Sequence, residues 1–444
     1  AKVSPHSRAN DHRREMEMTK SAYRDHLGRP LIAVTGMGIV TSLGRGKQDN
    51  WAALTGGTSG IHEITRFPTD GLSTRICGSV DFMDAGDMAS ELSFALADSA
   101  TREAVSQAGI DGDFNGPLFV AAPPIEVEWS ARFALADEYG SSGDSDNAYD
   151  GFLEVMRNRP HHAFTDTAIF GCVAERLADA YGTRGLPVTL STACASGATA
   201  IQLGVDAIRQ GRTDRALTVA ADGSVNAESL IRFSLLSALS TQNDPPQKAS
   251  KPFTRDRDGF VIAEGGAALV LESLEGAIAR GAKVLGILKG YGEKADHFHR
   301  TRSSPDGGPA IATIQAALDD AGLDASGIGY INAHGTSTPE NDKMEYLSLS
   351  TVFGDHLSGI PVSSNKSMIG HTLTAAGAVE AIFSLLTIQT GTLPPTINYE
   401  NPDTSIELDV VPNVKREHAV TSVLSNSFGF GGQNACLVMT AEPA

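Results

Sequence analysis

The sequence is poor in cysteine, and its few cysteines are widely spaced. Four occur among 444 residues, and no CxxC pair or Cys/His spacing of a zinc site accompanies them. They are Cys77, Cys172, Cys194 and Cys436. We therefore expect four free thiols in a reducing, cytoplasmic environment, and no metal. We interpret three of them as small buried hydrophobic residues and leave one for chemistry.

Positive charge is also scarce, and long apolar runs are missing. The chain has 35 Lys and Arg against 53 Asp and Glu, a net charge of −18. Nucleic acids and anionic membranes are therefore not expected as partners. No window approaches a run of about 18 apolar residues, so no membrane span is expected. Residues 1–30 are polar and lack an apolar core, which predicts a flexible N-terminal extension rather than a secretory signal.

Two cofactor-binding motifs begin but are not completed. An apolar run over 31–35 followed by Gly36-Met-Gly38 predicts a buried strand and a tight turn. Thr41 stands where a dinucleotide-binding motif needs its third glycine. Residues 254–259 resemble a calcium loop, but Gly265 replaces the bidentate glutamate. We therefore expect no bound cofactor.

Internal similarity indicates a duplicated architecture. Residues 104–110 resemble 317–323, each the Ala-rich end of a predicted helix closed by glycine. Residues 197–211 resemble 377–391, and both are 15-residue apolar segments bounded by glycines. Chance similarity between Ala- and Gly-rich helices is the alternative. The order strand, helix, strand, buried helix, strands occurs twice, which favours two fused α/β halves.

We place the two halves at 31–283 and 284–444. Segments 197–211 and 377–391 are apolar nearly all round, so we expect them to lie buried between two helix-covered sheets. The loops that precede these two segments would then meet near a pseudo-twofold axis. We expect the functional site at that meeting point.

The first of these loops carries Cys194. It follows an apolar strand predicted over 186–190 and opens the helix predicted over 197–211. A thiol at a helix N-terminus sits at the positive end of the helix dipole, which predicts a lowered pKa and a nucleophile. The small neighbours Ala193, Ala195 and Ser196 would leave the sulfur accessible. A buried structural cysteine is the alternative.

Histidines occur in two further loops. His334 follows a short apolar strand, and Thr338 can cap a helix that carries Pro339 at its first position and Glu345 further along. The loop that contains Lys366 and His371 precedes the helix predicted over 377–391, as the Cys194 loop precedes its counterpart. The repeat therefore predicts that this loop is buried opposite Cys194 rather than solvated.

A fourth loop is rich in glycine. Residues 426–434 contain Phe428 and Gly429, and Gly431 and Gly432 follow them. Such a loop lets the backbone approach a substrate and present N–H groups to an oxyanion. It lacks the Gly-Lys-Ser/Thr of a phosphate-binding loop. A thiol, two histidines, a lysine and an N–H-rich loop together suit thioester chemistry, in which neutral histidines stabilise an enolate.

These motifs resemble those of the beta-ketoacyl-[acyl carrier protein] synthases, elongating type, over residues 31–440. The motifs that carry the resemblance are Thr192-Ala-Cys194-Ala-Ser-Gly197, Asn332-Ala-His334-Gly-Thr-Ser-Thr-Pro339, Asn365-Lys366-Ser-Met-Ile-Gly-His371, Asn426-Ser-Phe428-Gly-Phe-Gly-Gly432 and Lys251–Phe260 followed by Gly265. The resemblance implies an α/β thiolase-like five-layer α-β-α-β-α fold, a homodimer, and the acyl and malonyl forms of an acyl carrier protein as partners.

The resemblance also implies roles. Cys194 would carry the acyl group, and His334 and His371 would stabilise the enolate formed when malonyl carrier loses CO₂. Lys366 and Glu345 would orient these groups. The remaining implied roles concern the substrate: oxyanion-hole N–H groups from Cys194 and Phe428, a gate at Phe428, and substrate contacts from Gly429, Thr336, Thr338 and Ile125.

Two segments depart from the family pattern. Residues 121–129 contain two prolines where a glycine-rich acyl-pocket turn is usual, and Ile125 is predicted to line the acyl tunnel there. Residues 81–91 contain no Lys or Arg where the family usually has a basic carrier-docking helix. A non-catalytic subunit resembling a chain-length factor, and a degradative thiolase, are the alternatives. Both conflict with the combination of Cys194, two histidines and Lys366.

Overall fold

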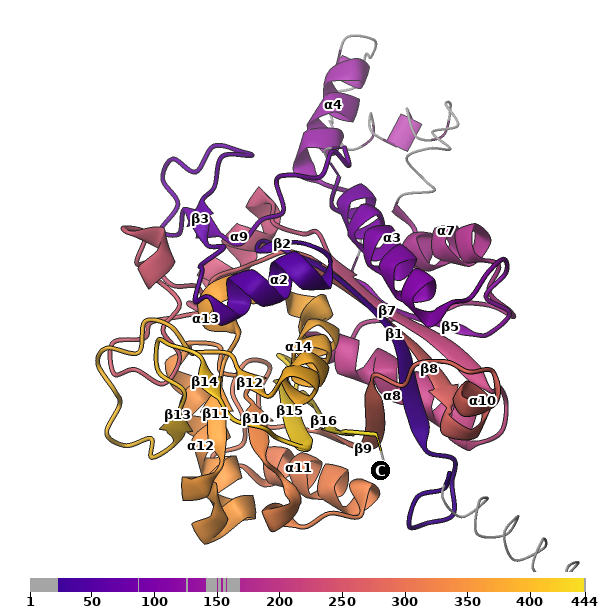
Figure 1. The fold of residues 1–444 in the computed structure, drawn as a ribbon. Helices are drawn as coiled ribbons and strands as arrows, with labels where there is room; N and C mark the ends of the chain where they lie inside the picture. Colours follow the sequence, from indigo (N-terminus) through magenta and orange to yellow (C-terminus); the bar gives the residue numbers. More distant parts are fainter. Residues whose placement is uncertain are drawn as a thin grey trace, which may run out of the picture.

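The computed structural model describes residues 23–86, 88–124, 127–140 and 168–442, together with residues 150, 153, 154 and 157. Most of the strands belong to one continuous mixed sheet. Its two parts face different ways and form two separate layers of the protein (Figure 1). The two parts are joined where residues 32–34 pair antiparallel with residues 286–288. Each part belongs to one half of the chain.

The first part contains five main strands. They are β1 (Ile32–Thr41), β5 (Leu118–Ala121), β6 (Val188–Leu190), β7 (Arg215–Asp222) and β8 (Gly265–Ser273). Their spatial order is β6-β5-β7-β8-β1. Strand β5 runs parallel to both β6 and β7, whereas β8 pairs antiparallel with β7 and β1.

The second part repeats this topology strand by strand. Its five counterparts are β9 (Gly286–Ala295), β10 (Tyr330–Asn332), β11 (Pro361–Ser363), β15 (Ser422–Phe428) and β16 (Gln433–Thr440). They lie in the order β11-β10-β15-β16-β9, with β13 (Asp409–Val410) added beyond β11. The parallel and antiparallel pairs fall at the same places as in the first part. The predicted duplication is therefore confirmed.

Helices complete five layers. Helices α3 (Ala89–Ala108) and α7 (Cys172–Tyr181) cover the outer face of the first part, and α11 (Gly308–Ala321) and α12 (Pro339–Phe353) cover that of the second. Helices α8 (Ser196–Arg209) and α14 (Ala376–Thr390) pack against each other between the two parts (Figure 1). The layers are therefore α-β-α-β-α, as predicted.

The remaining elements are short or peripheral. They are β2 (Gly44–Arg45), α2 (Gly46–Thr55), β3 (His62–Glu63), β4 (Ile76–Cys77), α4 (Trp129–Gly140), α9 (Ala227–Leu235), η1 (Pro246–Lys248), α10 (Leu274–Ala279), η2 (Ala325–Gly327), η3 (Gly354–Gly359), α13 (Lys366–Ile369), η4 (Leu373–Ala375), β12 (Thr392–Leu393) and β14 (Arg416–Glu417).

The two central helices touch backbone to backbone near their N-termini. A Cβ atom on Gly197 would lie 2.5 Å from the backbone nitrogen of Ala378, and one on Gly377 would lie 2.6 Å from that of Ala198. Real Cβ atoms do not approach other atoms so closely, so only glycine fits at these two equivalent positions. Their contact brings together the loops that precede α8 and α14.

Among the described residues, one segment is apolar and long enough to pass a length and composition test for a membrane span, at Leu373–Thr390. This segment comprises η4 and α14, and 83% of it is buried inside the protein. Burial between two sheets accounts for its composition, as in other helices that are apolar all round.

The prediction of a tight turn at Gly36–Gly38 is wrong, because β1 continues through both glycines to Thr41. A β-bulge between Val34 and Gly36 shifts the register there. Cβ atoms at Gly36 and Gly38 would lie 2.0 and 1.9 Å from backbone oxygens of α3. The glycines therefore mark a bulge and allow close packing of a helix on the strand.

Residues 23–30, the end of the segment expected to be flexible, contact the body of the protein. Arg29 forms ion pairs with Asp25 and with Asp320 of α11, each at 2.7 Å. Arg209, at the end of α8, also pairs with Asp320 at 2.7 Å. This partly buried cluster links the first half to the second. Residues 1–22 lie outside the described residues.

Candidate active site

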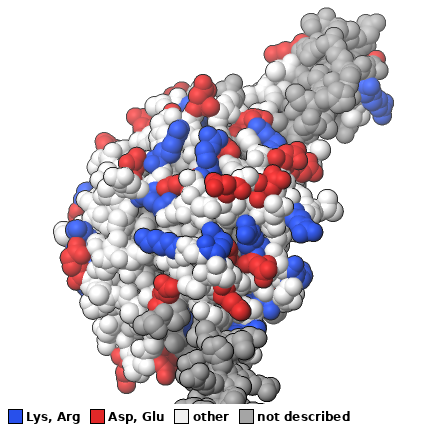
Figure 2. All heavy atoms as spheres, turned by 45° about the vertical axis from the view of Figure 1, so that its right-hand side comes forward, with Lys and Arg blue, Asp and Glu red and all other residues white. Residues whose placement is uncertain are grey.

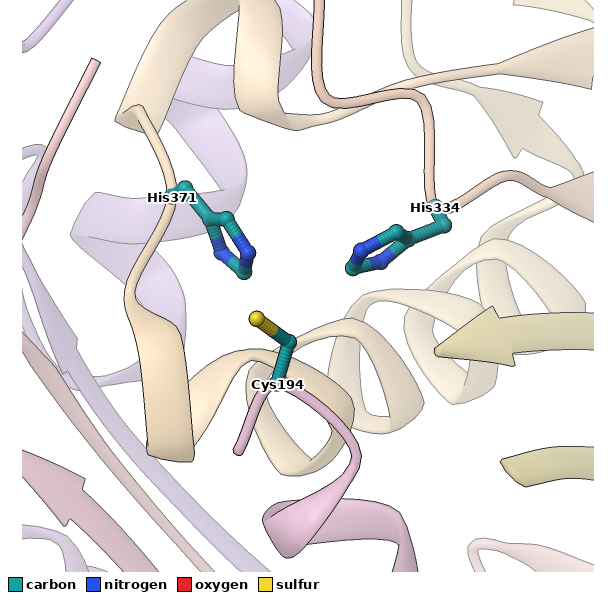
Figure 3. Close-up of side chains that lie close together, drawn as sticks. All are labelled: Cys194, His334 and His371. Atoms are coloured by element: carbon teal, nitrogen blue, oxygen red, sulfur yellow. The ribbon is translucent and has the colours of Figure 1, made fainter. Parts of the chain in front are cut away.

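Cys194 lies in the sharp turn between β6 and α8, where the sequence places it. The residue before it, Ala193, has a φ of +49°, an unusual backbone conformation for alanine. The Ser196 hydroxyl stabilises the turn by donating to the Ala193 carbonyl (2.6 Å) and accepting from the Thr192 N–H (2.7 Å). Helix α8 begins at Ser196, two residues beyond the sulfur. The turn directs the thiol toward the two histidines (Figure 3).

The predicted lowering of the Cys194 pKa is wrong. Removal of the sulfur from water is the largest influence and raises the pKa of the thiol to about 11. The backbone N–H of Phe430 and the positive charge of Lys366 oppose this rise but do not overcome it. A position near a helix terminus therefore does not by itself create a thiolate.

His334 is held by a buried carboxylate beneath its loop. The backbone N–H groups of His334 and Gly335 donate to the two oxygens of Glu345 at 2.8 and 2.7 Å, and the Asn426 amide donates to the same side chain at 3.0 Å. Thr338 caps α12, where its hydroxyl accepts from the Asn341 N–H at 3.2 Å, as predicted. Glu345 thus fixes the backbone that carries the histidine.

The His334 ring is oriented by Lys366. Lys366 Nζ donates to His334 Nδ1 at 3.3 Å, and the Phe428 carbonyl accepts a hydrogen bond from the same ring. Nδ1 is therefore the acceptor, which assigns the ring proton to Nε2. Lys366 also forms a buried ion pair with Glu380 of α14. Burial raises the pKa of Glu380 to about 7, and the pairing with Lys366 opposes that shift.

The His371 ring has the same arrangement. The backbone N–H of Leu373 donates to His371 Nδ1 at 3.3 Å, so the proton is again assigned to Nε2. This Nε2 is buried and has no hydrogen-bond partner in the described part of the chain. Desolvation and the charge of Lys366 hold the pKa values of both histidines well below the ordinary range, so both rings are neutral.

The three side chains converge on one point. The Cys194 sulfur and one nitrogen of each ring lie within 4.8 Å of one another, and the two ring centroids are 5.3 Å apart (Figure 3). A sulfur and two imidazole nitrogens are a donor set that zinc can use. Here both Nδ1 atoms accept hydrogen bonds, so each Nε2 carries a proton. The arrangement therefore favours two N–H donors beside a thiol over a metal site.

The glycine-rich loop contacts the cysteine, but through a different residue than predicted. The N–H of Phe430 donates toward the Cys194 sulfur. Phe428 is the last paired residue of β15, opposite Asn434, and its ring lies 5.9 Å from that of His334. A Cβ on Gly429 would lie 3.0 Å from the Thr192 carbonyl oxygen. Phe430, rather than Phe428, therefore presents the backbone donor at the sulfur.

A cavity of about 520 Å³ leads from these residues to the surface. Cys194, His334 and His371 line its inner end, and Thr336 and Thr338 line its wall. The hydroxyls of these two threonines are hydrogen-bonded to each other at 2.9 Å. The cavity is large enough for the end of an extended substrate.

The segment that follows β5 contacts a different, smaller cavity. Pro123, Pro124, Val127 and Glu128 line a space of about 40 Å³ beside α9. The Glu128 carboxylate accepts from the Ala89 N–H at the start of α3. Ile125 lies outside the described residues, so its place in an acyl tunnel stays a prediction.

Two residues of the site were missed by the sequence argument. Glu380 lies on an otherwise apolar helix, and a lone acid there gave no sign that it pairs with Lys366. Phe430 was passed over for Phe428, two residues earlier. Strand alternation could not have separated them, because residues two apart fall on the same face, and only the structure shows that β15 ends at Phe428.

Comparison with known proteins agrees with this geometry. Residues 30–277 match the family "Beta-ketoacyl synthase, N-terminal domain" and residues 285–400 the family "Beta-ketoacyl synthase, C-terminal domain". The 3-oxoacyl-[acyl-carrier-protein] synthase 2 of Coxiella burnetii is 35% identical over 416 residues, which cover 92% of this chain and 98% of that protein. The tetracenomycin polyketide synthase ketoacyl synthase alpha subunit of Streptomyces glaucescens is 36% identical over 417 residues, which cover 92% and 96%.

A solved structure extends the similarity to three dimensions. A solved structure of a type II PKS acyl-carrier protein in complex with its ketosynthase bound to the hexaketide contains a chain that superposes with a TM-score of 0.81 at 32% identity. The match covers 93% of this chain and 100% of that one. The chain therefore belongs to the beta-ketoacyl synthase family, the acyltransferase-type condensing enzymes.

Proposed function

We propose that the chain is a beta-ketoacyl-[acyl carrier protein] synthase that lengthens acyl chains in fatty-acid biosynthesis by decarboxylative condensation. The observation that carries this proposal is the pair of neutral histidines beside the Cys194 sulfur. The Nε2–H of His371 has no partner among the described residues, and the ring of His334 donates to the Phe428 carbonyl. Two neutral donors stabilise a developing negative charge and do not remove protons. Such a site suits an enolate, which forms when a malonyl thioester loses CO₂.

In the first step, Cys194 attacks the acyl thioester of an acyl carrier protein. The new bond joins the Cys194 sulfur to the acyl carbon, and the carrier thiol leaves with the proton of the cysteine. The backbone N–H groups of Cys194 and Phe430, which both donate toward the sulfur region, are suited to stabilise the tetrahedral oxyanion.

In the second step, malonyl carrier occupies the same cavity and loses CO₂. The Nε2–H groups of His334 and His371 donate to the thioester oxygen as it becomes an enolate. The enolate carbon then attacks the acyl carbon, and the Cys194 thiolate leaves and takes up one proton. The products are CO₂, free Cys194 and a carrier-bound 3-ketoacyl chain longer by two carbons.

Lys366, Glu380 and Glu345 are positioning residues in this scheme. Lys366 fixes the tautomer of His334. Lys366 and Glu380 are both buried, and the negative charge of Glu380 balances the positive charge of Lys366. Glu345 holds the backbone of the His334 loop. Thr336, Thr338, Phe428 and Gly429 would contact the substrate or gate its entry.

We further propose a cytoplasmic homodimer. Strand β6 is one edge of the sheet; its first residue, Val188, is 40% exposed, and Leu186 just before it is 92% exposed. Ile169 and Phe170, which precede α7, are also exposed. An unpaired edge with exposed apolar residues is suited to pair with a second copy. Four free cysteines agree with a reducing compartment.

A condensation assay tests the proposal. Purified protein, an acyl carrier protein loaded with acyl chains of different lengths, and malonyl carrier are incubated together, and the carrier is analysed by mass spectrometry. The proposal predicts a 3-ketoacyl carrier two carbons longer than the primer. A protein that takes up no acyl chain and forms no product would favour the non-catalytic partner subunit.

A further inference from the structure

Asp222 is a buried carboxylate to which the proposed mechanism assigns no role. It is the last residue of β7 and is 1% exposed. Its backbone pairs with Gly265 of β8, so the strand ladder fixes its position. Ala216 and Ala220, on the same face of β7 by alternation, pack into the core around α8 and α14. The Asp222 side chain therefore faces the layer of helices that the catalytic loops precede.

Acidic side chains on the surface lie among cations, and Asp222 does not. Figure 2 shows Asp and Glu intermixed with Lys and Arg over one face of the molecule. Along α3, Arg102 pairs with Asp98 at 2.6 Å and Arg176 pairs with Glu91 at 3.1 Å. Asp222 forms no ion pair with any residue in the described ranges. A buried carboxylate without a cation is costly, so hydrogen bonds have to stabilise it.

The hydrogen bonds of Asp222 join the end of β7 to the segment before α14. One carboxylate oxygen accepts from the Ser224 N–H at 3.1 Å and from the Ser224 hydroxyl. The other accepts from the Thr374 N–H at 3.1 Å and from the Thr374 hydroxyl at 2.7 Å, and the Ala221 carbonyl, at 3.0 Å, is a second acceptor for that hydroxyl. Burial raises the pKa of Asp222, and these hydrogen bonds oppose the rise.

Thr374 belongs to η4, and the residue before it is strained. Leu373 has a φ of +46°, a backbone conformation that is costly for leucine. In this conformation the Leu373 N–H donates to Nδ1 of His371 at 3.3 Å. A strained backbone persists only where its surroundings impose it. The hydrogen bonds from Thr374 to Asp222 supply such a constraint at the next residue.

The ring of His371 depends on η4 more than on its own backbone. The His371 N–H donates to the Val261 carbonyl at 2.7 Å, and the His371 carbonyl accepts from the Ala263 N–H at 2.9 Å. These contacts leave the ring free to rotate. Phe260 packs against the ring with centroids 5.3 Å apart, which does not select a tautomer. Among the described residues, the Leu373 N–H is the one hydrogen-bonding partner of the ring.

We propose that Asp222 is a positioning residue for His371. It holds η4 through Thr374, and η4 holds the His371 ring through the Leu373 N–H, so that Nε2–H is directed toward the developing enolate oxygen. Neither Asp222 nor Thr374 lines the active-site cavity, so both act through the histidine. The inference rests on the proposed function and adds to it a residue of the first half that controls a histidine of the second.

A double-mutant cycle on CO₂ release from malonyl carrier tests the inference. Asp222→Ala frees η4, and CO₂ release should fall about tenfold or more, because misplacement of a catalytic group by about 1 Å costs up to about 10²-fold. Acylation of Cys194, measured by intact mass, should persist. In a His371→Ala background the same substitution should cause no further loss, whereas in a His334→Ala background the loss should remain.

Variants of Thr374 give a second route and a matched control. Thr374→Val removes the hydroxyl but keeps the N–H, so it should lower CO₂ release less than Asp222→Ala does. Thr374→Ser restores the hydroxyl and should recover most of that loss. Thr313→Val is the control, because the Thr313 hydroxyl is also buried and donates to the Pro309 carbonyl at 2.8 Å, but lies in α11 on the outer face. It should release CO₂ at the wild-type rate.

Two results would overturn the inference. The first is wild-type CO₂ release by a folded Asp222→Ala protein. The second is an equal loss from Asp222→Ala with and without His371, which would mean that Asp222 supports the fold at large. If Asp222→Ala does not fold, Thr374→Val replaces it in the same cycle, and an equal loss in both backgrounds has the same meaning. A wild-type protein that releases no CO₂ from malonyl carrier would instead contradict the proposed function.

Discussion

The Cys194 thiol lies between two histidine rings and is removed from water, and both features determine how it reacts. A pKa of about 11 means that only a small fraction is thiolate near neutral pH. The thiol should therefore react slowly with oxidants and alkylating agents near neutral pH.

The pH dependence of Cys194 alkylation follows from this pKa. Because only the thiolate reacts with iodoacetamide, the rate of labelling should rise about tenfold per pH unit between pH 6 and 9. Labelling is measured by mass spectrometry of the peptide that contains Cys194. A plateau in this range, with a midpoint near pH 7, would mean that the helix terminus outweighs burial.

The histidines should be needed for the second step only. His334→Ala and His371→Ala each remove one enolate donor, so malonyl decarboxylation should fall about 10²- to 10³-fold. Acylation of Cys194 should persist in both variants. His356→Ala, at an exposed histidine of η3, is the control and should leave both steps unchanged. Normal CO₂ release by either active-site variant would refute the assignment.

The sequence predicts catalytic residues well where they stand in distinctive motifs. Cys194, His334, His371 and Lys366 each stand in a loop of small residues after an apolar strand, and the structure brings all four together. Glu380 was not predicted, because its role depends on which residue of another element faces it. The pKa of Cys194 was also mispredicted, since burial is a property of the whole fold.

At the scale of elements, the crossing of α8 and α14 positions the site. Both helices begin close to catalytic loops, and Gly197 and Gly377 allow their backbones to touch. The sequence repeat predicted that these helices are equivalent and buried. The repeat did not predict that glycine is required where the two helices cross. The sequence argument likewise interpreted Gly36 and Gly38 as a turn. Both errors have one cause, because the close approach of another element depends on the tertiary structure.

Substitution of a crossing glycine should damage the site and the fold together. Gly377→Ala places a methyl group 2.6 Å from the Ala198 nitrogen, so the helices must move apart, at a cost of about 1–3 kcal/mol in unfolding free energy. Denaturant unfolding measures the loss, and Cys194 acylation should slow. Gly359→Ala, where no atom lies within 4 Å of the added group, is the control. Equal stability of the two variants would contradict the crossing argument.

At the scale of the whole molecule, the duplicated topology was accessible from the sequence because each half repeats one order of elements. The N-terminal boundary was harder to predict, since the contact of Arg29 with Asp320 joins residues far apart in the chain. The proposed dimer likewise depends on an edge strand, which only the assembled sheet identifies.

The proposed dimer edge can be tested by a single charge. Leu186 is 92% exposed beside β6, so Leu186→Glu should place a carboxylate in the interface and convert the dimer to a monomer. Light scattering after size-exclusion chromatography measures the mass. Leu27→Glu, at a leucine that is 61% exposed elsewhere, should remain dimeric. A dimer in both variants would exclude this edge as the interface.

The central claim is that Cys194 carries the growing chain, and intact-mass analysis tests it most directly. The wild-type protein is incubated with acyl carrier proteins of several chain lengths, and its mass is measured without malonyl carrier. The account predicts a mass increase of one acyl group in the wild type and none in Cys194→Ala. An acylated Cys194→Ala protein, or a wild-type protein that no acyl carrier modifies, would contradict it.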